Sequence, residues 1–214
     1  MRGLLLTNYY LVFRSLFVYI GVALLGAGLI FYFGDTSIHR YVAFLTMFVA
    51  MPALEVIKHE GKSGYDKYVL TLPVTRTNIV QSHYFFHFIT VVIGTLLSCG
   101  IFYIYGLVSD TPIDGIYNTV SFGTFIVLFA GAIAFPLLYV LGSEKSDVIT
   151  VGGAIGGYIA TLGIQSIIRY LTEPLANLNI DPSFYVPIIF ITFGVVIYIF
   201  SYFIATFIYH KKEF

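Results

Sequence analysis

Six long apolar runs alternate with short polar breaks along the chain. A helix needs about 20 residues to cross the hydrocarbon core of a bilayer. Most of the apolar runs are close to this length or longer. They lack the strict alternation of barrel strands, and a helix satisfies its own backbone hydrogen bonds in lipid. The pattern therefore predicts an all-α integral membrane protein with six transmembrane helices. The predicted helices cover residues 15–33, 41–57, 83–107, 119–141, 149–171 and 185–209.

The composition agrees with this pattern. Hydrophobic residues make up 58% of the chain and charged residues only 10%, whereas about 25% of the residues of an average soluble domain are charged. So few charges cannot cover a water-soluble surface, which predicts one multi-pass membrane domain over residues 1–214. The formal net charge is zero, so no global field attracts nucleic acid. Cys99 lies within an apolar run and is expected to be a small buried hydrophobe.

The basic residues of the breaks fall mainly on one side of the predicted membrane. Cytoplasmic segments retain Lys and Arg, so this side is predicted to be the cytoplasm, with both chain termini on it. A bacterial cytoplasmic membrane is the expected location. Only Arg40 and Arg169 fall on the opposite side. The other nine of the 11 basic residues are Arg2, Arg14, Lys58, Lys62, Lys67, Arg76, Lys145, Lys211 and Lys212.

The longest cytoplasmic break, about residues 58–78, contains a short amphipathic pattern. Its apolar residues recur at i, i+3, i+4 and i+7, which predicts a short helix between helices two and three. Pro73 ends this helix, and the polar residues 75–78 can cap the next one. A helix of about nine residues is not stable alone in water, so its apolar face must rest on the membrane surface or on a partner protein. The apolar set is Tyr65, Tyr68, Val69 and Leu72, and the polar set is Asp66, Lys67 and Thr71.

Residues 62–76 read KSGYDKYVLTLPVTR and resemble the cytoplasmic segment of ABC-2-type transporter permeases. Members of this family commonly have a Gly, aromatic, acidic run there, followed by a Leu-Pro-Val-Ser/Thr-Arg turn. The layout of six helices with both termini inside also resembles the family over the whole chain. The chain departs from the family where an acidic residue and a Lys-Tyr pair are common, because it has Asn78 and His83-Tyr84 at those positions.

The resemblance implies a permease subunit of an ATP-driven exporter. In the family, the short helix couples to a separate ABC nucleotide-binding subunit that holds ATP and Mg²⁺, so this chain would be non-catalytic and would bind no cofactor itself. A second permease, identical or different, would complete the transporter. The segment also resembles that of permeases for phenol-soluble modulins, which are amphipathic toxin peptides, and a lipid-like cargo is the other expectation. Transferred residue by residue, the ATPase-docking set is Tyr65, Asp66, Tyr68, Val69, Leu72, Pro73 and Arg76.

Two motifs near this segment are incomplete. Residues 61–63 resemble the end of a Walker A loop, but Val56 stands where that motif needs glycine. If transport is driven by ATP, hydrolysis must therefore be supplied by another chain. The His-Glu pair at residues 59–60 begins a zincin motif, but Ser63 occupies the position of the second histidine.

Two histidines and one serine could belong to a metal site or to a protease. His83 and His87 are four residues apart and would share a helix face, as two metal ligands must. No third ligand is evident, so polar packing near the cytoplasmic end is favoured over a metal site. A turn at residues 61–64 resembles that of an intramembrane serine protease, but Ser63 lies in a charged loop and the last span has no histidine to act as base. A membrane sensing or binding protein without transport activity is the alternative that the spans leave open.

Several residues inside the predicted helices have structural or functional interpretations. Glu55 and Arg169 are the ionisable residues closest to membrane depth, where charge is usually paired or functional. Glu55 is expected either to pair with a basic residue, at position 14 or 76, or to act in gating or substrate passage. Pro52 and Pro136 predict helix kinks. The small residues at 152–157 predict close approach of a neighbouring helix.

Overall fold

The structure is a computed structural model that describes residues 2–33, 38–109, 115–172 and 182–212. In these ranges every regular element is helical, in agreement with the predicted all-α class. Their side chains are described except at residues 30–31, 33, 38–44, 108–109, 169, 171–172 and 182–184.

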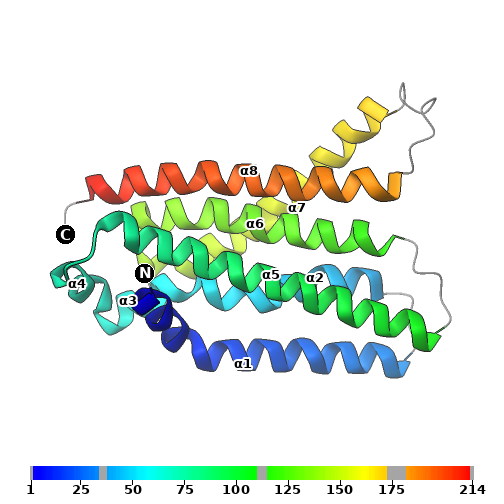
Figure 1. The fold of residues 1–214 in the computed structure, drawn as a ribbon, viewed down its shortest axis with the longest axis horizontal. Helices are drawn as coiled ribbons and strands as arrows, with labels where there is room; N and C mark the ends of the chain where they lie inside the picture. The colour runs from blue at the N-terminus through cyan, green and yellow to red at the C-terminus, as the bar shows by residue number, and fades with distance from the viewer. Residues whose placement is uncertain (1, 34–37, 110–114, 173–181, 213–214) are drawn as a thin grey trace.

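Six long helices of the described ranges form a bundle, and short helical elements connect α2 to α5 and α6 to α7 (Figure 1). The long helices are α1 (Arg2–Phe33), α2 (Ile38–Leu54), α5 (Arg76–Ser109), α6 (Ile116–Leu141), α7 (Ser146–Thr172) and α8 (Pro182–Lys211). The short elements are α3 (Val56–Ser63), α4 (Tyr65–Tyr68), and the 3-10 turns η1 (Val69–Thr71) and η2 (Ser143–Lys145).

Five of the described helices are long and apolar enough to cross a membrane, namely α1, α5, α6, α7 and α8. Helix α2 has 17 residues, which at ~1.5 Å per residue gives a length of about 26 Å. A hydrocarbon core is about 30 Å thick. The fold therefore fits the predicted integral membrane class with five candidate spans, and the sixth span at residues 41–57 stays a prediction.

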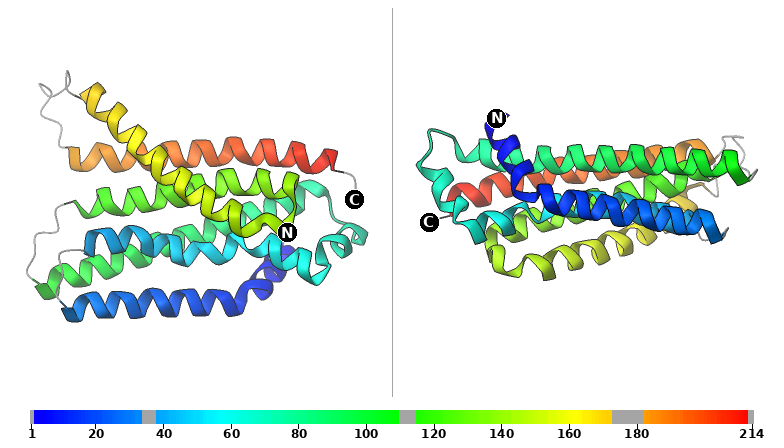
Figure 2. Two further views of the ribbon diagram at one scale, coloured as in Figure 1. Left: turned by 180° about the vertical axis from the view of Figure 1, so that it is seen from behind. Right: turned by 90° about the horizontal axis from the view of Figure 1, so that it is seen from below.

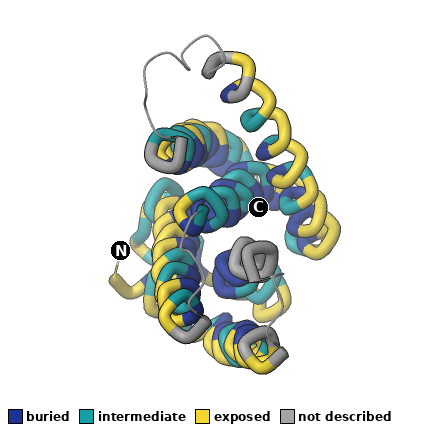
Figure 3. Tube along the Cα trace, turned by 90° about the vertical axis from the view of Figure 1, so that its right-hand side faces the viewer, coloured by how far each residue is buried: buried dark blue, intermediate teal, exposed yellow. Residues whose placement is uncertain are grey.

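Helix α6 is the core of the bundle. It packs against α2, α5, α7 and α8, and 61% of its most apolar stretch is buried, compared with 22% to 39% in the other four candidate spans. Helix α1 lies outside, on α2 and α5. The view along the bundle shows buried residues facing its inside and exposed residues on its periphery (Figure 3). This distribution is expected when apolar side chains also face lipid.

Two glycines let α7 approach α6. A Cβ atom at Gly153 would lie 3.0 Å from the carbonyl oxygen of Ala130, and a Cβ at Gly157 would lie 2.7 Å from that of Ile126. The predicted role of the small residues at 152–157 in close helix packing is confirmed. Beyond this contact, α7 crosses the bundle obliquely and its C-terminal end leaves it (Figure 2).

Pro136 lies inside α6, where its missing N–H leaves the carbonyl of Ala132 without its usual helical donor. Ser201 of α8 donates its hydroxyl to that carbonyl at 2.5 Å. Because the hydroxyl proton of Ser201 is used there, the Tyr84 hydroxyl on α5 donates to Ser201, with an oxygen–oxygen distance of 2.7 Å. Ser201 of α8 therefore satisfies the backbone at this proline, and Tyr84 of α5 donates to Ser201.

The N-terminal and C-terminal ends of the chain lie at the same end of the bundle as α3 and α4 (Figure 1). That this end of the bundle faces the cytoplasm stays a prediction.

Candidate functional site

The predicted coupling segment differs from one continuous helix. Helix α3 comes first, and the one-turn helix α4 and the 3-10 turn η1 follow it. Gly64 separates α3 from α4 with a φ of 72°, and its N–H donates to the carbonyls of Glu60 and Gly61, as a glycine after a helix C-terminus commonly does. The expected helix of about nine residues is therefore two helical turns over residues 65–71, and a further helix stands where a non-helical break was expected.

The segment exposes some predicted docking residues and buries others. Tyr68 is 58% exposed, and Pro73 is exposed as well. Val69 is only 1% exposed and belongs to the main core cluster, against which the half-buried Tyr65 and Leu72 also pack. The four apolar residues therefore do not form a single free face in this structure: Val69 anchors the segment, and Tyr68 stays accessible.

Polar residues fix the turn that follows η1. Thr75 accepts the backbone N–H of Asn78 through its Oγ1 at 3.2 Å, which confirms the predicted cap at the start of α5. Asp66 is half-buried, and its Oδ1 is buried without a hydrogen-bond partner among the described residues.

Arg76 joins the start of α5 to the end of α8. Its Nη1 donates to the carbonyls of Tyr209, His210 and Lys212 at 3.4, 2.8 and 2.9 Å. The last carbonyls of a helix lack the N–H groups of a following turn as donors, and a cation at a helix C-terminus also interacts favourably with the helix dipole. Arg76 was expected to fix the turn after the docking helix; in this structure its guanidinium caps α8.

Glu55 lies at the break between α2 and α3, where its N–H donates to the carbonyl of Pro52 at 3.1 Å. The Tyr19 hydroxyl donates to Glu55 Oε1 at 3.4 Å, and His59 Nε2 lies 3.9 Å from Oε2. The expected arginine partners are therefore replaced by a tyrosine and a histidine. Arg169 belongs to α7, and its side chain lies outside the described residues.

Helix α3 is held against the α6–α7 connection. Lys58 forms an ion pair with Asp147 in the first turn of α7, and the hydrogen bond to this carboxylate raises the pKa of the Lys58 ammonium. Gly61 lies against Ser143 of η2, since a Cβ at Gly61 would lie only 2.8 Å from the Cβ of Ser143. The Gly-Lys-Ser sequence at 61–63 therefore packs as part of a helix.

A chain of buried polar side chains leads from α3 into the bundle. Glu60 is 5% exposed, and its Oε1 lies 3.1 Å from Nε2 of His83 on α5, which is 2% exposed. The other ring nitrogen of His83, Nδ1, lies 2.8 Å from the hydroxyl of Tyr139 on α6. In the sequence, Glu60 stands out only within an incomplete zincin motif, since no local pattern pairs position 60 with position 83.

One turn further along α5, His87 is fully buried and also contacts a tyrosine. The Tyr198 hydroxyl donates to the carbonyl of Tyr84 at 2.9 Å, so His87 Nδ1–H donates to the Tyr198 oxygen, also at 2.9 Å. Gly131 faces the imidazole, and a Cβ there would lie 2.5 Å from the ring. Polar packing of His83 and His87, favoured by the sequence, is what the structure shows.

The described residues contain no cluster of three or more His, Cys, Asp or Glu side chains with metal-binding geometry. Ser63, the serine of the protease-like turn, donates its hydroxyl to the carbonyl of Glu60 at 3.1 Å. This bond is a local helix-end contact, and it places no base beside the serine.

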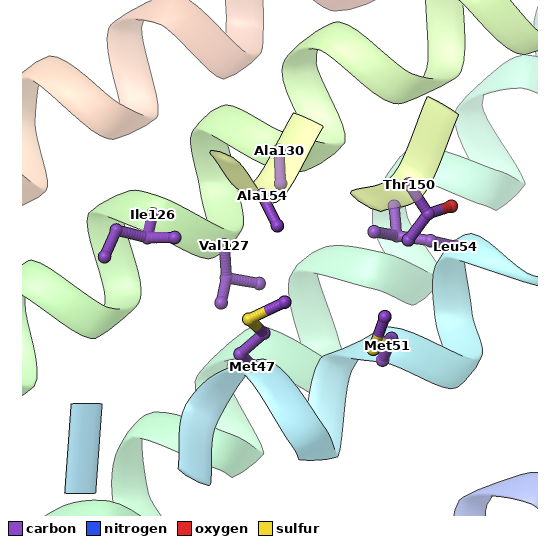
Figure 4. A pocket seen from close by; sticks show the side chains of 8 residues that line it. All are labelled: Met47, Met51, Leu54, Ile126, Val127, Ala130, Thr150 and Ala154. Atoms are coloured by element: carbon purple, nitrogen blue, oxygen red, sulfur yellow. The ribbon is translucent and has the colours of Figure 1, made fainter. Parts of the chain in front are cut away.

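A small apolar hollow of about 260 Å³ lies between α2, α6 and α7 (Figure 4). Much of this volume is open to the outside, and the centre of a water-sized sphere fits in only about 10 Å³ of it, which is room for about one water molecule and not for a ligand. Thr150 contributes a polar atom to the lining, and its buried Oγ1 has no hydrogen-bond partner among the described residues. The lining residues are Met47, Met51, Leu54, Ile126, Val127, Ala130, Thr150 and Ala154.

The fold and this site define a polytopic helical membrane protein with a short helical segment packed on one end of its bundle. The family model described as ABC-2 family transporter protein matches residues 3–210. The chain therefore belongs to this family, whose members are generally non-catalytic transmembrane permeases that work with an ABC ATPase subunit. No curated protein and no solved structure gives a significant match.

Proposed function

We propose that this chain is the permease subunit of an ATP-driven exporter and that α4 and η1 dock a separate ABC ATPase on the cytoplasmic side. Tyr68 carries the proposal. It is a large aromatic side chain, 58% exposed, on a segment at the bundle end where both chain termini lie. Tyrosine is enriched at protein interfaces because it supplies a large apolar area with a polar tip.

The anchoring of the segment supports this role. Val69 fixes it in the main core cluster, and Arg76 ties the next helix to the end of α8. Movement imposed on Tyr68 would therefore be transmitted to α5 and α8 rather than absorbed by a loose loop. In the proposed complex, Tyr65, Asp66, Leu72 and Pro73 complete the docking surface around Tyr68.

We propose that two permeases pair and recruit two ATPases, whose closure on ATP moves the docked segments. Inside one chain, polar side chains of neighbouring helices pair with each other. Thr46 contacts Ser98 at 2.9 Å, and Thr95 contacts Thr124 at 2.9 Å. Such pairing leaves little reason for cargo to pass through the interior of one subunit and supports a pathway at the interface between two permeases.

Cargo and gating are the finer parts of the proposal. The aromatic-rich spans fit amphipathic peptides of the phenol-soluble modulin type or lipid-like compounds.

Glu55 is a proposed gating residue because it lies at the break between α2 and α3 and contacts Tyr19 of α1. Arg169 is a second proposed gating residue, on the basis of its position in α7 alone. Glu55→Gln should leave expression and thermal stability intact and lower transport, whereas loss of folded protein would indicate a structural role.

The docking proposal is tested by co-expressing the chain with the ABC ATPase encoded nearest to it. Complex formation in detergent and vanadate-sensitive ATP hydrolysis are measured for the wild type and for Tyr68→Asp. Tyr117→Asp is the matched control, because Tyr117 is 64% exposed but lies in the first turn of α6, at the opposite end of the bundle.

We expect Tyr68→Asp to lose the ATPase while the wild type and Tyr117→Asp retain it. If the wild type binds no ATPase, the non-transport sensing alternative is favoured. If Tyr68→Asp binds normally, α4 is only an interfacial connection between two spans.

A further inference from the structure

Glu60 is a buried carboxylate in the last turn of a short helix. Helix α3 has eight residues, and only Val56, Ile57 and Glu60 of it are buried. A carboxylate this far from water needs a partner, because desolvation of an unpaired charge is costly. That partner is the equally buried His83, whose Nε2 lies 3.1 Å from Glu60 Oε1.

His83 bridges two further helices. It belongs to α5 and contacts Tyr139 of α6 through Nδ1 at 2.8 Å. The ring of Tyr139 packs edge-on against that of Tyr209 on α8, with 5.0 Å between centroids. One polar chain therefore connects α3 to α5 and α6 and ends on the aromatic packing of α8.

The two ends of this chain lie next to two places where regular helical hydrogen bonding is interrupted. At one end, the backbone carbonyl of Glu60 accepts the N–H of Gly64, the left-handed residue between α3 and α4. At the other end, Tyr139 lies three residues after Pro136, where α6 has lost a helical hydrogen bond. Helix α3 is also held by the ion pair of Lys58 with Asp147 and by the close contact of Gly61 with Ser143.

We propose that Glu60 is a positioning residue that transmits displacement of the docked segment through His83 and Tyr139 to the proline region of α6. This inference rests on the proposed function, because it requires an ATPase on α4. Glu60 itself does not touch the ATPase or the cargo. Its contribution is a buried link from α3 to α5 and α6 through His83 and Tyr139. Helix α4 has no buried residue of its own that could supply such a link.

The test uses the complex of the full chain with its ATPase in lipid nanodiscs. Hydrogen exchange is measured at α4 and at residues 133–141 of α6, with ADP and after trapping with ATP and vanadate. Couplings through packed side-chain networks correspond to factors of about 2 to 30, so an exchange change in that range is expected at both places in the wild type.

Glu60→Ala should keep the ATPase bound and keep the nucleotide-dependent change at α4, while the change in α6 is lost. Glu144→Ala is the control, since Glu144 is an exposed residue of the neighbouring η2 turn, and it should behave as the wild type. A merely structural role of Glu60 would instead alter exchange in α6 equally in both nucleotide states and leave the response to ATP unchanged.

A second variant covers the case in which Glu60→Ala does not fold. Tyr139→Phe removes one hydroxyl and keeps the ring, so it cuts the link at α6 with little loss of packing; Tyr158→Phe on the exposed part of α7 is its control. We expect Tyr139→Phe to lose the nucleotide response of α6 and Tyr158→Phe to keep it. A full response in Tyr139→Phe or Glu60→Ala would overturn the inference and leave the docking proposal intact, whereas absence of ATPase binding in the wild type would remove the docking proposal itself.

Discussion

At the scale of single residues, the carbonyl of Ala132 illustrates what a membrane bundle demands of its backbone. Pro136 cannot donate to this carbonyl, and lipid offers no water as a substitute. Ser201 supplies the donor from α8, and Tyr84 in turn donates to Ser201. Three helices therefore take part in the hydrogen bonding at the proline of α6.

Ser201→Ala should destabilise the protein by about 1–2 kcal/mol, because it leaves both the Ala132 carbonyl and the Tyr84 hydroxyl without this partner. Thermal unfolding in detergent measures the effect. Thr206→Ala is the control, since the Thr206 hydroxyl bonds only to the carbonyl of Tyr202 in its own helix.

The same measurement in a Pro136→Ala background tests the mechanism. Alanine restores the N–H that the Ala132 carbonyl lacks, so Ser201→Ala should cost less there than in the wild type. Equal costs in the two backgrounds would show that Ser201 does not act by replacing the N–H that Pro136 lacks.

Residue-level predictions from the sequence were correct where local chemistry decides. The cap at the start of α5 joins Thr75 to Asn78, only three positions away, so the local sequence predicts it. The partners of Glu55 and Glu60 depend on how α1, α3 and α5 meet, and residues 36 or 23 positions apart carry no local signal. For that reason an arginine, and not Tyr19, was expected as the partner of Glu55, and the contact of Glu60 with His83 was not predicted.

At the scale of helices, the contact between α6 and α7 depends on the absence of side chains at two positions. Gly157 meets the backbone of Ile126, which cannot move aside as a flexible side chain would. A Cβ at Gly152, on the same helix, would meet no atom of a neighbouring helix within 4 Å among the described residues. The two glycines therefore differ in role although they belong to one small-residue stretch.

Gly157→Ala should destabilise the protein by about 1–3 kcal/mol through overpacking. Gly152→Ala should be neutral or stabilising by up to about 1 kcal/mol, because alanine is the better helix former. Midpoints of thermal unfolding compare the two variants. A stabilising Gly157→Ala would mean that α7 does not lie as close to α6 as described.

The end of α8 depends on a side chain from another helix. Arg76→Ala removes the donor to three terminal carbonyls, so hydrogen exchange at residues 208–212 should rise several-fold while the middle of α8 keeps its protection. Lys67→Ala, an exposed change on α4, is the control and should leave α8 unaffected. Unchanged exchange in Arg76→Ala would contradict the capping role.

The apolar runs predicted the existence of the long helices, because the thickness of the membrane dictates such runs. Two starts were wrong, since α1 begins at Arg2 and not at residue 15, and α5 begins at Arg76 and not at residue 83. The sequence did not predict α3, whose residues VIKHEGKS are mostly polar and include a glycine. Tertiary contacts stabilise this helix: Val56 and Ile57 are buried, and Lys58 pairs with Asp147 on α7. Burial of Val69 was also missed, since an amphipathic pattern indicates an apolar face but does not show what covers it.

At the scale of the whole molecule, one end of the bundle differs from the other. The termini, α3, α4 and the cap of α8 gather at this end (Figure 1), and the buried chain of Glu60, His83 and Tyr139 leads from it into the bundle. This asymmetry fits the proposed function, in which the ATPase would contact the permease at one end only.

Cross-linking at α4 tests this account most directly. Cys99 is the only cysteine of the chain, so a Cys99→Ala background allows a single new thiol, from Tyr68→Cys, to carry a photoactivatable cross-linker in the complex with the ATPase. Tyr117→Cys at the opposite end is the matched control. A cross-link to the ATPase is expected from position 68 and none from position 117. A cross-link from position 117 alone, or none from position 68 in a complex that still hydrolyses ATP, would contradict the docking proposal.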